Sequence, residues 1–361
     1  MAVLTAWISG YNRSLTIGEE SQQMHILITG GMGRVGKVVT ERLAQKGDDV
    51  RVIGIEPDPQ MAGIEYVTCD ILDYAHVRQQ MKGIDAVIHL AAIPSPRSNP
   101  GWETFQVNAA GTFNIFEAAA EEGIKRIVQA SSINAFGCAW SKADIQADYF
   151  PIDEAHSRLT TDPYSFSKQV IEDIGDYYWR REGISSVAMR FPAVWPADYV
   201  NSERFREGRV KMCAALDELV AQPEDQRLAR LAAARERALV FRDQKMMEYP
   251  HPSPEKSLGG SPDDLILQAY TFERFNFWAF VDERDSAQSM DKALTANFEG
   301  SHALFINADQ NWLGYDSQTL VRLFFPEVKQ WKQPIQGAGT LVSFEKARTL
   351  IGYAPDYTVE L

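Results

Sequence analysis

Cysteine is scarce in this chain of 361 residues, which contains only Cys69, Cys138 and Cys213. The three are widely scattered without CxxC spacing, so neither a disulfide framework nor a zinc site is indicated, and no metal site is predicted. No apolar run reaches the ~20 residues that a membrane helix needs. Positive charge is in deficit, and the formal net charge of -13 argues against nucleic acid or an anionic membrane as a partner. A reducing cytoplasm is the expected location.

The first 23 residues stand apart from the pattern that follows them. They include the apolar stretch AVLTAWI, but no basic residue precedes it and no cleavage signature follows, so no signal peptide is predicted. Residues 1–23 are expected to form a peripheral extension. The whole composition, 45% hydrophobic and 24% charged, is ordinary for a globular protein, and the length suits one large domain with an appendage or two domains.

A glycine-rich segment, MHILITGGMGRVG at 24–36, follows a short β-branched strand and precedes a stretch with helical character at 37–45. It satisfies GxGxxG and TGxxGxxG together. Strand, tight glycine turn and helix in this order hold a pyrophosphate against the unpaired N–H groups of the helix N-terminus. The contacts expected with a dinucleotide in this turn are Gly30, Gly33, Arg34, Val35 and Gly36.

The next apolar run ends at Glu56, which lies 20 residues beyond Gly36. A carboxylate at about this distance accepts hydrogen bonds from the adenosine ribose. Asp58 is the rival ribose ligand. Either carboxylate would repel a 2′-phosphate, so the expected cofactor is NAD rather than NADP, although Arg34 and Arg51 weaken that preference.

Strands and helices alternate regularly through the first half of the chain, which predicts an α/β fold with a Rossmann-type doubly wound parallel sheet. The NAD-binding domain is expected over 24–190, with a return segment at about 275–310. Residues 191–274 and 311–361 are expected to form a smaller substrate domain. Its charged helical insertion at 201–262, broken at Pro223, is either a solvated appendage or a lid or subunit contact.

Three side chains with catalytic chemistry fall late in the first half. The fifth strand delivers Ser132 to the carboxyl edge of the sheet, where ligands bind in such folds. Tyr164 and Lys168 stand four residues apart on the next predicted helix and therefore share one face. A phenol titrates near 10, and a nearby ammonium together with an oxidised nicotinamide is expected to bring it into a working range.

The combined motifs resemble the extended short-chain dehydrogenase/reductases, specifically the NAD-dependent epimerase/dehydratase family. They are TGGMGRVG at 29–36, HLAA at 89–92, Asn108, ASSINAFG at 130–137, YSFSK at 164–168, FVDERD at 280–285 and KARTLIGYAP at 346–355. The resemblance implies that Tyr164 is the acid/base, that Lys168 assists it and binds the nicotinamide ribose, and that Ser132 bonds the reacting oxygen. It also implies further cofactor contacts at Asp70, Ile71, Leu90, Ala91, Ala92, Asn108, Ser131 and Phe191.

Two departures from the family pattern narrow the activity. Ser132 is followed by Ile133 and Asn134 where the dehydratases carry an Asp-Glu pair, so dehydration is disfavoured. Ala193 stands where nucleotide-sugar enzymes of the family place an asparagine that contacts the diphosphate. A diphosphate-linked substrate is therefore less expected. The expected substrate contacts are Ser132, Ile133, Asn134 and Arg190.

These observations predict an NAD-dependent enzyme that transfers a hydride at a carbinol carbon of a sugar-type substrate. An epimerase and a net dehydrogenase of a free sugar or sugar acid, such as a uronate, both remain open. A non-catalytic NAD-sensing regulatory protein is the alternative from another class. The resemblance also implies a homodimer, and the helices predicted at 102–122 and 163–181 have apolar faces that permit such a contact.

Overall fold

The computed structural model describes residues 23–57, 63–250 and 264–359. The predicted extension at 1–23 lies outside this part of the chain except for its last residue, and so does Asp58. Among the described residues, no helix is long and apolar enough to cross a membrane.

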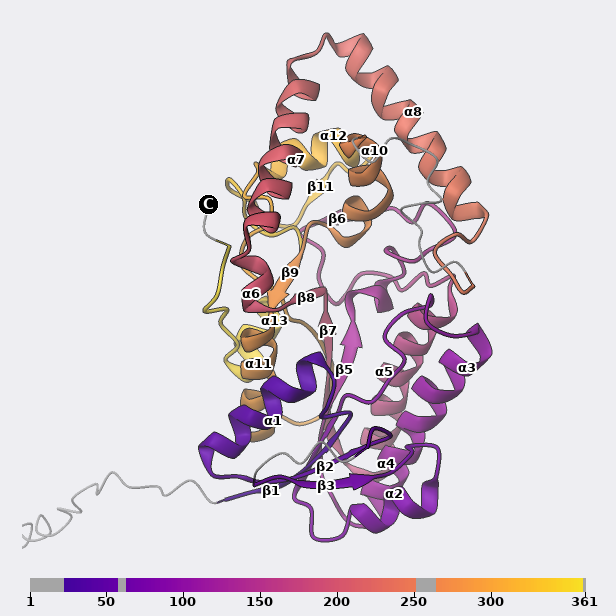
Figure 1. The fold of residues 1–361 in the computed structure, drawn as a ribbon, viewed down its shortest axis with the longest axis vertical. Coiled ribbons are helices and arrows are strands. Elements are labelled where there is room, and N and C mark those ends of the chain that lie inside the picture. Colours follow the sequence, from indigo (N-terminus) through magenta and orange to yellow (C-terminus); the bar gives the residue numbers. More distant parts are fainter. Residues whose placement is uncertain (1–22, 58–62, 251–263, 360–361) are drawn as a thin grey trace, which may run out of the picture.

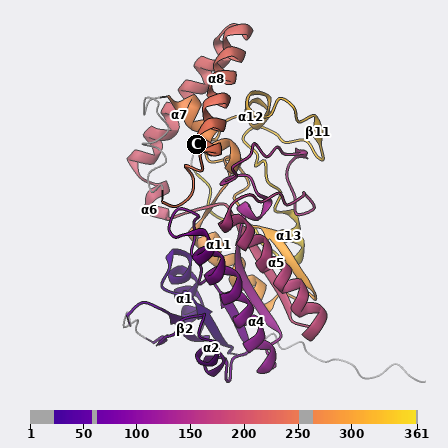
Figure 2. The same cartoon turned by 90° about the vertical axis from the view of Figure 1, so that its right-hand side faces the viewer.

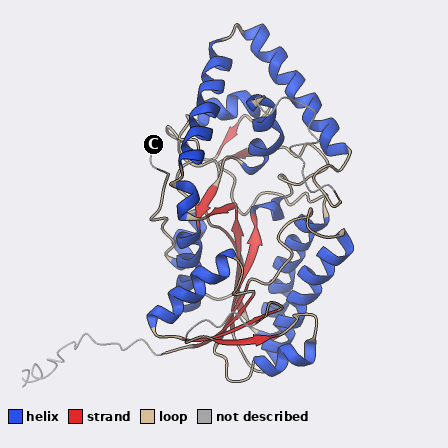
Figure 3. Ribbon diagram, viewed as in Figure 1, coloured by secondary structure: helices blue, strands red, loops and turns tan. Residues whose placement is uncertain are grey.

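A seven-stranded, fully parallel sheet forms the lower half of the molecule, in the order β10-β7-β5-β4-β1-β2-β3 (Figures 1 and 3). Its strands are β1 (His25–Thr29), β2 (Asp49–Gly54), β3 (Glu65–Thr68), β4 (Ala86–His89), β5 (Arg126–Ser132), β7 (Ser185–Phe191) and β10 (Ser301–Phe305). The predicted α/β fold is confirmed. The order reverses beside β1, which places the glycine turn at the switch point where such sheets bind ligands.

Helices cover both faces of this sheet, and each face has its own core (Figure 2). One face carries α1 (Arg34–Lys46), α11 (Glu283–Thr295) and α13 (Glu345–Ile351). The other carries α2 (Tyr74–Gln80), α4 (Gly111–Glu121) and α5 (Pro163–Glu182), with the short α3 (Gly101–Phe105) above. Side chains alternate along β1, so Ile26 and Ile28 enter the first core whereas Leu27 enters the second.

The upper part of the molecule is built around a third core and carries a long helical hairpin (Figure 1). The hairpin consists of α7 (Glu203–Ala221) and α8 (Glu224–Asp243), which meet at Pro223 as predicted. The remaining helices are α6 (Ala197–Val200), α10 (Leu265–Gln268) and α12 (Ser317–Phe324), with irregular turns η2 (Ile133–Phe136), η3 (Ala269–Glu273) and η4 (Arg274–Asn276). Two short strand pairs complete it, β6 (Tyr149–Phe150) with β11 (Gln330–Trp331) and β8 (Ala193–Trp195) with β9 (Phe280–Asp282).

One face of the helical hairpin packs into this upper core, and residues 251–262 of the predicted insertion lie outside the described part of the chain. From α7, Met212, Leu216 and Leu219 are buried in this core, and α8 adds Leu231 and Ala238. The apolar stripe that the sequence shows at helical spacing is therefore the inner face of the hairpin.

Two predicted helices differ from those in the structure. The first begins at Arg34 rather than at residue 37, because the extended backbone of Gly33 caps it and Gly36 lies inside the helix. The helix predicted at 102–122 is interrupted by a π-helical turn, η1 (Gln106–Ala110), centred on Asn108. Such turns are frequent at functional sites.

Candidate active site

A cavity of about 610 Å³ opens at the carboxyl edge of the sheet, beside the glycine turn. Eight of the residues predicted to contact a cofactor line it, namely Gly30, Gly33, Glu56, Asp70, Ile71, Leu90, Ala91 and Ala92. They come from the ends of β1, β2, β3 and β4, which the parallel sheet brings together. The cavity therefore follows the path along which a doubly wound sheet holds an extended dinucleotide.

The glycines in the turn are required by close backbone approaches. Gly30 has φ +68°, and a Cβ there would lie 2.7 Å from the backbone nitrogen of Ala91. A Cβ on Gly36 would lie 2.4 Å from the carbonyl oxygen of Gly30. Gly33 places no side chain over the start of α1, so the first N–H groups of that helix remain open to an anion.

Some cavity residues were not found from the sequence. Trp102 and Ile55 line the cavity although their side chains are 71% and 73% exposed. Exposed apolar groups of this size beside a cavity point to a ligand that covers them. Periodicity could not identify them, because an outward-facing aromatic at the start of a helix has no distinctive spacing.

Seven of the predicted cofactor contacts lie outside this cavity's lining, namely Arg34, Val35, Gly36, Asn108, Ser131, Lys168 and Phe191. Arg34 donates from Nη1 to the carbonyl of Val194 at 3.0 Å. Val35 packs against the sheet core, and Phe191 is buried in β7. Their predicted contacts with a cofactor stay predictions.

Ser132, Tyr164 and Lys168 converge where β5 meets the start of α5. Asp162 caps α5 by accepting from the Ser165 N–H at 2.8 Å, and Pro163 is the first helical residue, as predicted. Tyr164 and Lys168 are both buried, and the Lys168 Nζ donates to the carbonyl of Ala130 at 2.7 Å. That nitrogen lies 5.8 Å from the centroid of the Tyr164 ring.

The protein's own groups make Tyr164 harder to ionise. Burial raises the pKa of Tyr164 to about 12, a hydrogen bond with Ser132 opposes this rise, and the charge of Asp162 adds to it. Burial lowers the pKa of Lys168 to about 8, because the ammonium loses its contact with water, and the charge of Glu172 opposes that change. The expected lowering of the Tyr164 pKa by Lys168 together with an oxidised nicotinamide stays a prediction.

Glu172 engages two residues that were predicted to bind ligands. Ser131 Oγ donates to its Oε1 at 2.8 Å. Arg190 donates to Oε1 at 2.9 Å and to Oε2 at 2.8 Å, in a buried bidentate ion pair. Both side chains are thus directed to a carboxylate of α5, while the buried Nη1 of Arg190 has no hydrogen-bond partner among the described residues. The predicted contacts of Ser131 with cofactor and of Arg190 with substrate stay predictions.

The side chain of Asn108 is also hydrogen-bonded within the protein. Its Oδ1 accepts from the Ile93 N–H at 2.7 Å, and its Nδ2 donates to the Ile93 carbonyl and to Ser167 Oγ, each at 3.0 Å. The amide is buried and joins the loop after β4 to α5, so it positions the site and does not offer a free group to a cofactor.

Asn134, in contrast, keeps an open polar group beside Ser132. Its backbone N–H donates to Ser132 Oγ at 3.1 Å. Its side-chain oxygen is buried and has no hydrogen-bond partner among the described residues. A buried acceptor without a partner is costly, so this oxygen marks a position for a donor group.

Comparison with known proteins adds independent information. A sequence profile described as "NAD dependent epimerase/dehydratase family" matches residues 26–215. The uronate dehydrogenase of Pseudomonas putida is 34% identical over 174 residues, which is 47% of this chain and 61% of that protein. The L-arabinose 1-dehydrogenase (NAD(P)(+)) of Haloferax volcanii is 31% identical over 192 residues, or 51% of this chain and 73% of that protein. The match thus spans less than two thirds of the uronate dehydrogenase.

Solved structures share the fold at lower sequence identity. A short-chain dehydrogenase/reductase superfamily protein from Agrobacterium tumefaciens with bound NAD superposes with a TM-score of 0.61 and 20% identity, over 93% of both chains. The UDP-glucose 4-epimerase of Thermotoga maritima gives a TM-score of 0.57 and 17% identity, over 93% of this chain and 94% of the other. Identities this low establish the architecture alone.

Proposed function

The chain belongs to the NAD dependent epimerase/dehydratase family, and from this premise we propose that it transfers a hydride between NAD and a carbinol carbon of a sugar-type substrate. The observation that carries the proposal is the cavity whose lining includes eight predicted cofactor residues and which lies on the same sheet edge as Ser132 and Tyr164. A bound nicotinamide would supply the hydride acceptor.

The residues of the cavity suit NAD. The start of α1 and the glycine turn would hold the pyrophosphate, and Glu56 would accept hydrogen bonds from the adenosine ribose. Tyr66 holds Glu56 by donating to its backbone carbonyl at 2.8 Å. Trp102 and Ile55 would cover the adenine. Glu56 would also repel a 2′-phosphate, which favours NAD over NADP.

The chemistry of the chain itself centres on Tyr164. Its hydroxyl would take the proton of the substrate hydroxyl, and Ser132 would donate a hydrogen bond to the carbonyl oxygen that forms. Because burial raises its pKa, positive charge on the bound cofactor and on Lys168 must favour the phenolate during turnover. The open oxygen of Asn134 would accept a hydrogen bond from a substrate hydroxyl.

Net oxidation of a free sugar or sugar acid is the favoured outcome of this transfer. The uronate dehydrogenase and the L-arabinose 1-dehydrogenase described above carry dehydrogenase names, and the side chain of Ala193 offers no amide to a substrate diphosphate. An epimerase, which returns the hydride to the opposite face, is the second candidate.

Incubation with NAD and single substrates tests the proposal. We expect net NADH with a uronate or an aldose such as L-arabinose, and little with UDP-glucose. Isomer formation without NADH would identify an epimerase. NAD binding without turnover on any sugar of the panel would favour the NAD-sensing alternative.

We also propose a homodimer in a reducing cytoplasm. Phe113, Phe166 and Tyr177 expose 42%, 46% and 40% of their surface on α4 and α5, which lie side by side in Figure 2. An apolar patch on these helices suits a contact between two copies of the chain. Cys69, Cys138 and Cys213 are all free thiols, as expected where disulfides do not form.

A further inference from the structure

A second cavity, of about 630 Å³, lies between the helical hairpin and α12 and shares no lining residue with the cofactor cavity. Figure 1 shows α10 and α12 beneath the hairpin of α7 and α8. The cavity is lined by arginines and apolar side chains, with Glu224 and Tyr270 among them.

Positively charged side chains predominate in the lining of this cavity, whereas the whole chain is negatively charged. Arg227 and Arg235 from α8 and Arg322 from α12 line it, against the single carboxylate of Glu224. Arg227 donates to the carbonyl of Val220 at 3.2 Å, and Arg322 donates to Thr319 Oγ1 at 3.1 Å. Within the part of the chain that the structure describes, neither arginine has an ion-pair partner. In a protein with a net charge of -13, such a cluster is a local exception.

Tyr270 adds an unused polar group. Only 4% of it is exposed, and its ring packs against Phe324 and Arg274. Its hydroxyl has no hydrogen-bond partner among the described residues, and the side chain lines the cavity. The hydroxyl is therefore available to donate to an acceptor atom of a ligand in the cavity.

We propose that this cavity binds a small organic anion with a phosphate or carboxylate group on an apolar body. Guanidinium groups bind both anions through paired N–H donors, and the Tyr270 hydroxyl would donate to the same group. Leu228, Leu231 and Leu323 form an apolar surface against which the body of the ligand would pack.

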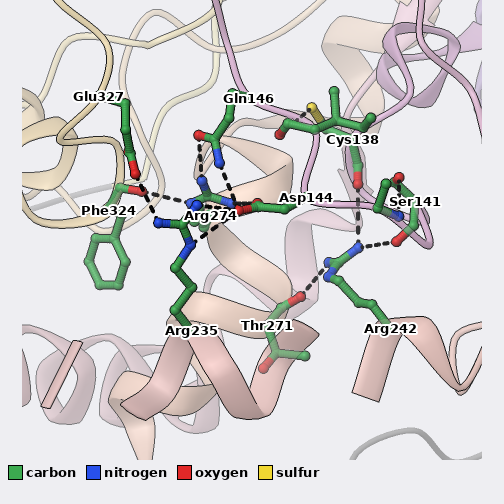
Figure 4. Close-up of polar contacts among 12 residues, drawn as sticks. Cys138, Ser141, Asp144, Gln146, Arg235, Arg242, Thr271, Arg274, Phe324 and Glu327 are labelled. Carbon is green, nitrogen blue, oxygen red and sulfur yellow. Dashed lines mark hydrogen bonds and ion pairs between the residues drawn. The ribbon is translucent and has the colours of Figure 1, made fainter. Parts of the chain in front are cut away.

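Arg235 connects this cavity to the segment that follows β5 (Figure 4). It donates to Asp144 at 2.7 Å and to Glu327 at 2.9 Å. Asp144 also accepts from the buried Arg274 at 2.7 Å, and Arg274 holds Gln146 at 2.7 Å. An anion bound at Arg235 would compete with the half-exposed Glu327 for its guanidinium group. It would then contact a residue that is itself bonded to Asp144.

Isothermal titration calorimetry of the full chain tests the site with three probes. Inorganic phosphate measures the anion alone, phenyl phosphate adds an apolar body, and benzoate presents a carboxylate on that body. We expect phenyl phosphate to bind more tightly than inorganic phosphate, because its ring buries apolar surface. The comparison with benzoate tells which anionic group the cavity prefers.

Substitutions of the lining residues test whether the probe binds in this cavity. Combined Arg227→Ala and Arg322→Ala should raise the Kd of phenyl phosphate about tenfold or more, since charge-assisted hydrogen bonds are lost. Tyr270→Phe should raise it less. Glu327→Gln should lower it, because the competing carboxylate is removed from Arg235. Arg230→Ala is the matched control on α8, where Arg230 pairs with Glu218 outside the cavity lining, and should leave the Kd unchanged.

Two results would overturn the proposal. Equal affinity of the double arginine variant and the unmodified chain would place the probe elsewhere, for example at the glycine turn. The absence of measurable binding by all three probes would show that the cavity does not take such anions. Neither result bears on hydride transfer, because the two cavities share no lining residue.

Discussion

Tyr164 is the residue on which the proposed chemistry depends, and its surroundings are not those of a ready base. Burial keeps its hydroxyl protonated in the chain alone, while Lys168 is turned toward the carbonyl of Ala130. We therefore expect Tyr164 to act as a base only in the complex with oxidised NAD, whose positive charge would favour the phenolate.

Replacing this hydroxyl tests its role directly. Tyr164→Phe should lower kcat by about 10²- to 10⁴-fold, the usual contribution of a positioned acid or base, with NAD affinity largely retained. Steady-state kinetics and NAD titration measure the two quantities separately. Unchanged turnover in this variant would remove Tyr164 from the mechanism.

Asp162 links helix capping to the pH dependence of the site. It is 3% exposed, one oxygen caps α5, and the other has no hydrogen-bond partner among the described residues. Burial raises its pKa from 3.8 to about 6, helped by the charge of Glu248. The folded state thus holds more protons than the unfolded state between these values, so stability falls as pH rises through this window and the cost persists above it.

Asp162→Asn should remove that cost while the amide oxygen still caps the helix. We expect equal thermal stability of the two proteins at about pH 4 and a more stable variant at about pH 7. Because Asp162 also raises the pKa of Tyr164, the acidic limb of the kcat/KM profile should move to lower pH in the variant. A lower Tm of the variant at both pH values would contradict this account.

At the scale of elements, α8 holds the segment that follows Ser132. Arg242 is buried and donates to the carbonyls of Ala139 at 3.1 Å, Ser141 at 2.8 Å and Thr271 at 2.5 Å (Figure 4). Its guanidinium also lies 3.5 Å from the Phe275 ring centroid. Burial lowers the pKa of Arg242 to about 9, which shows how costly this charge is without a directly bonded carboxylate.

Replacing Arg242 should make the segment after Ser132 less firmly held. Arg242→Met leaves buried carbonyls without a donor and should lower the free energy of unfolding by about 2–4 kcal/mol. Turnover should fall about 10- to 100-fold through displacement of the segment after Ser132. Arg237→Met, at another position on α8, breaks an exposed pair with Asp264 of the α10 N-cap; it is the control and should cost less than about 1 kcal/mol.

Denaturant unfolding and steady-state kinetics measure both effects. Arg242→Lys should recover part of the stability, because an ammonium still donates to carbonyls but lacks the planar fork. If Arg242→Met and Arg237→Met behaved alike, α8 would have no part in holding the loop.

At the scale of the whole molecule, the proposed homodimer depends on the aromatic patch on α4 and α5. Phe113→Glu combined with Phe166→Glu should convert a dimer into a monomer, because two carboxylates would be buried at the contact in each copy. Sedimentation equilibrium measures the mass. Val240→Glu, at a side chain 54% exposed on α8, is the control and should leave the mass unchanged. A chain that is already monomeric without these substitutions would refute the dimer.

The sequence by itself determined the order of the elements, the glycine turn and the capped start of α5, because these depend on neighbouring residues. Backbone sterics require glycine at Gly30, and a proline after a capping aspartate begins a helix wherever it occurs. The alternation of strands and helices likewise predicted the parallel sheet whose edge gathers the cavity.

Only the tertiary structure decided how polar side chains are paired. Arg190 and Ser131 both meet Glu172, and Asn108 joins a loop to a helix 59 residues away, through contacts that no local spacing reveals. The tertiary structure also determined that one face of the α7–α8 hairpin is buried in the upper core, and that burial is the largest influence on the pKa of Tyr164. The physical reason is that burial and charge pairing depend on neighbours in space, which the sequence places far apart.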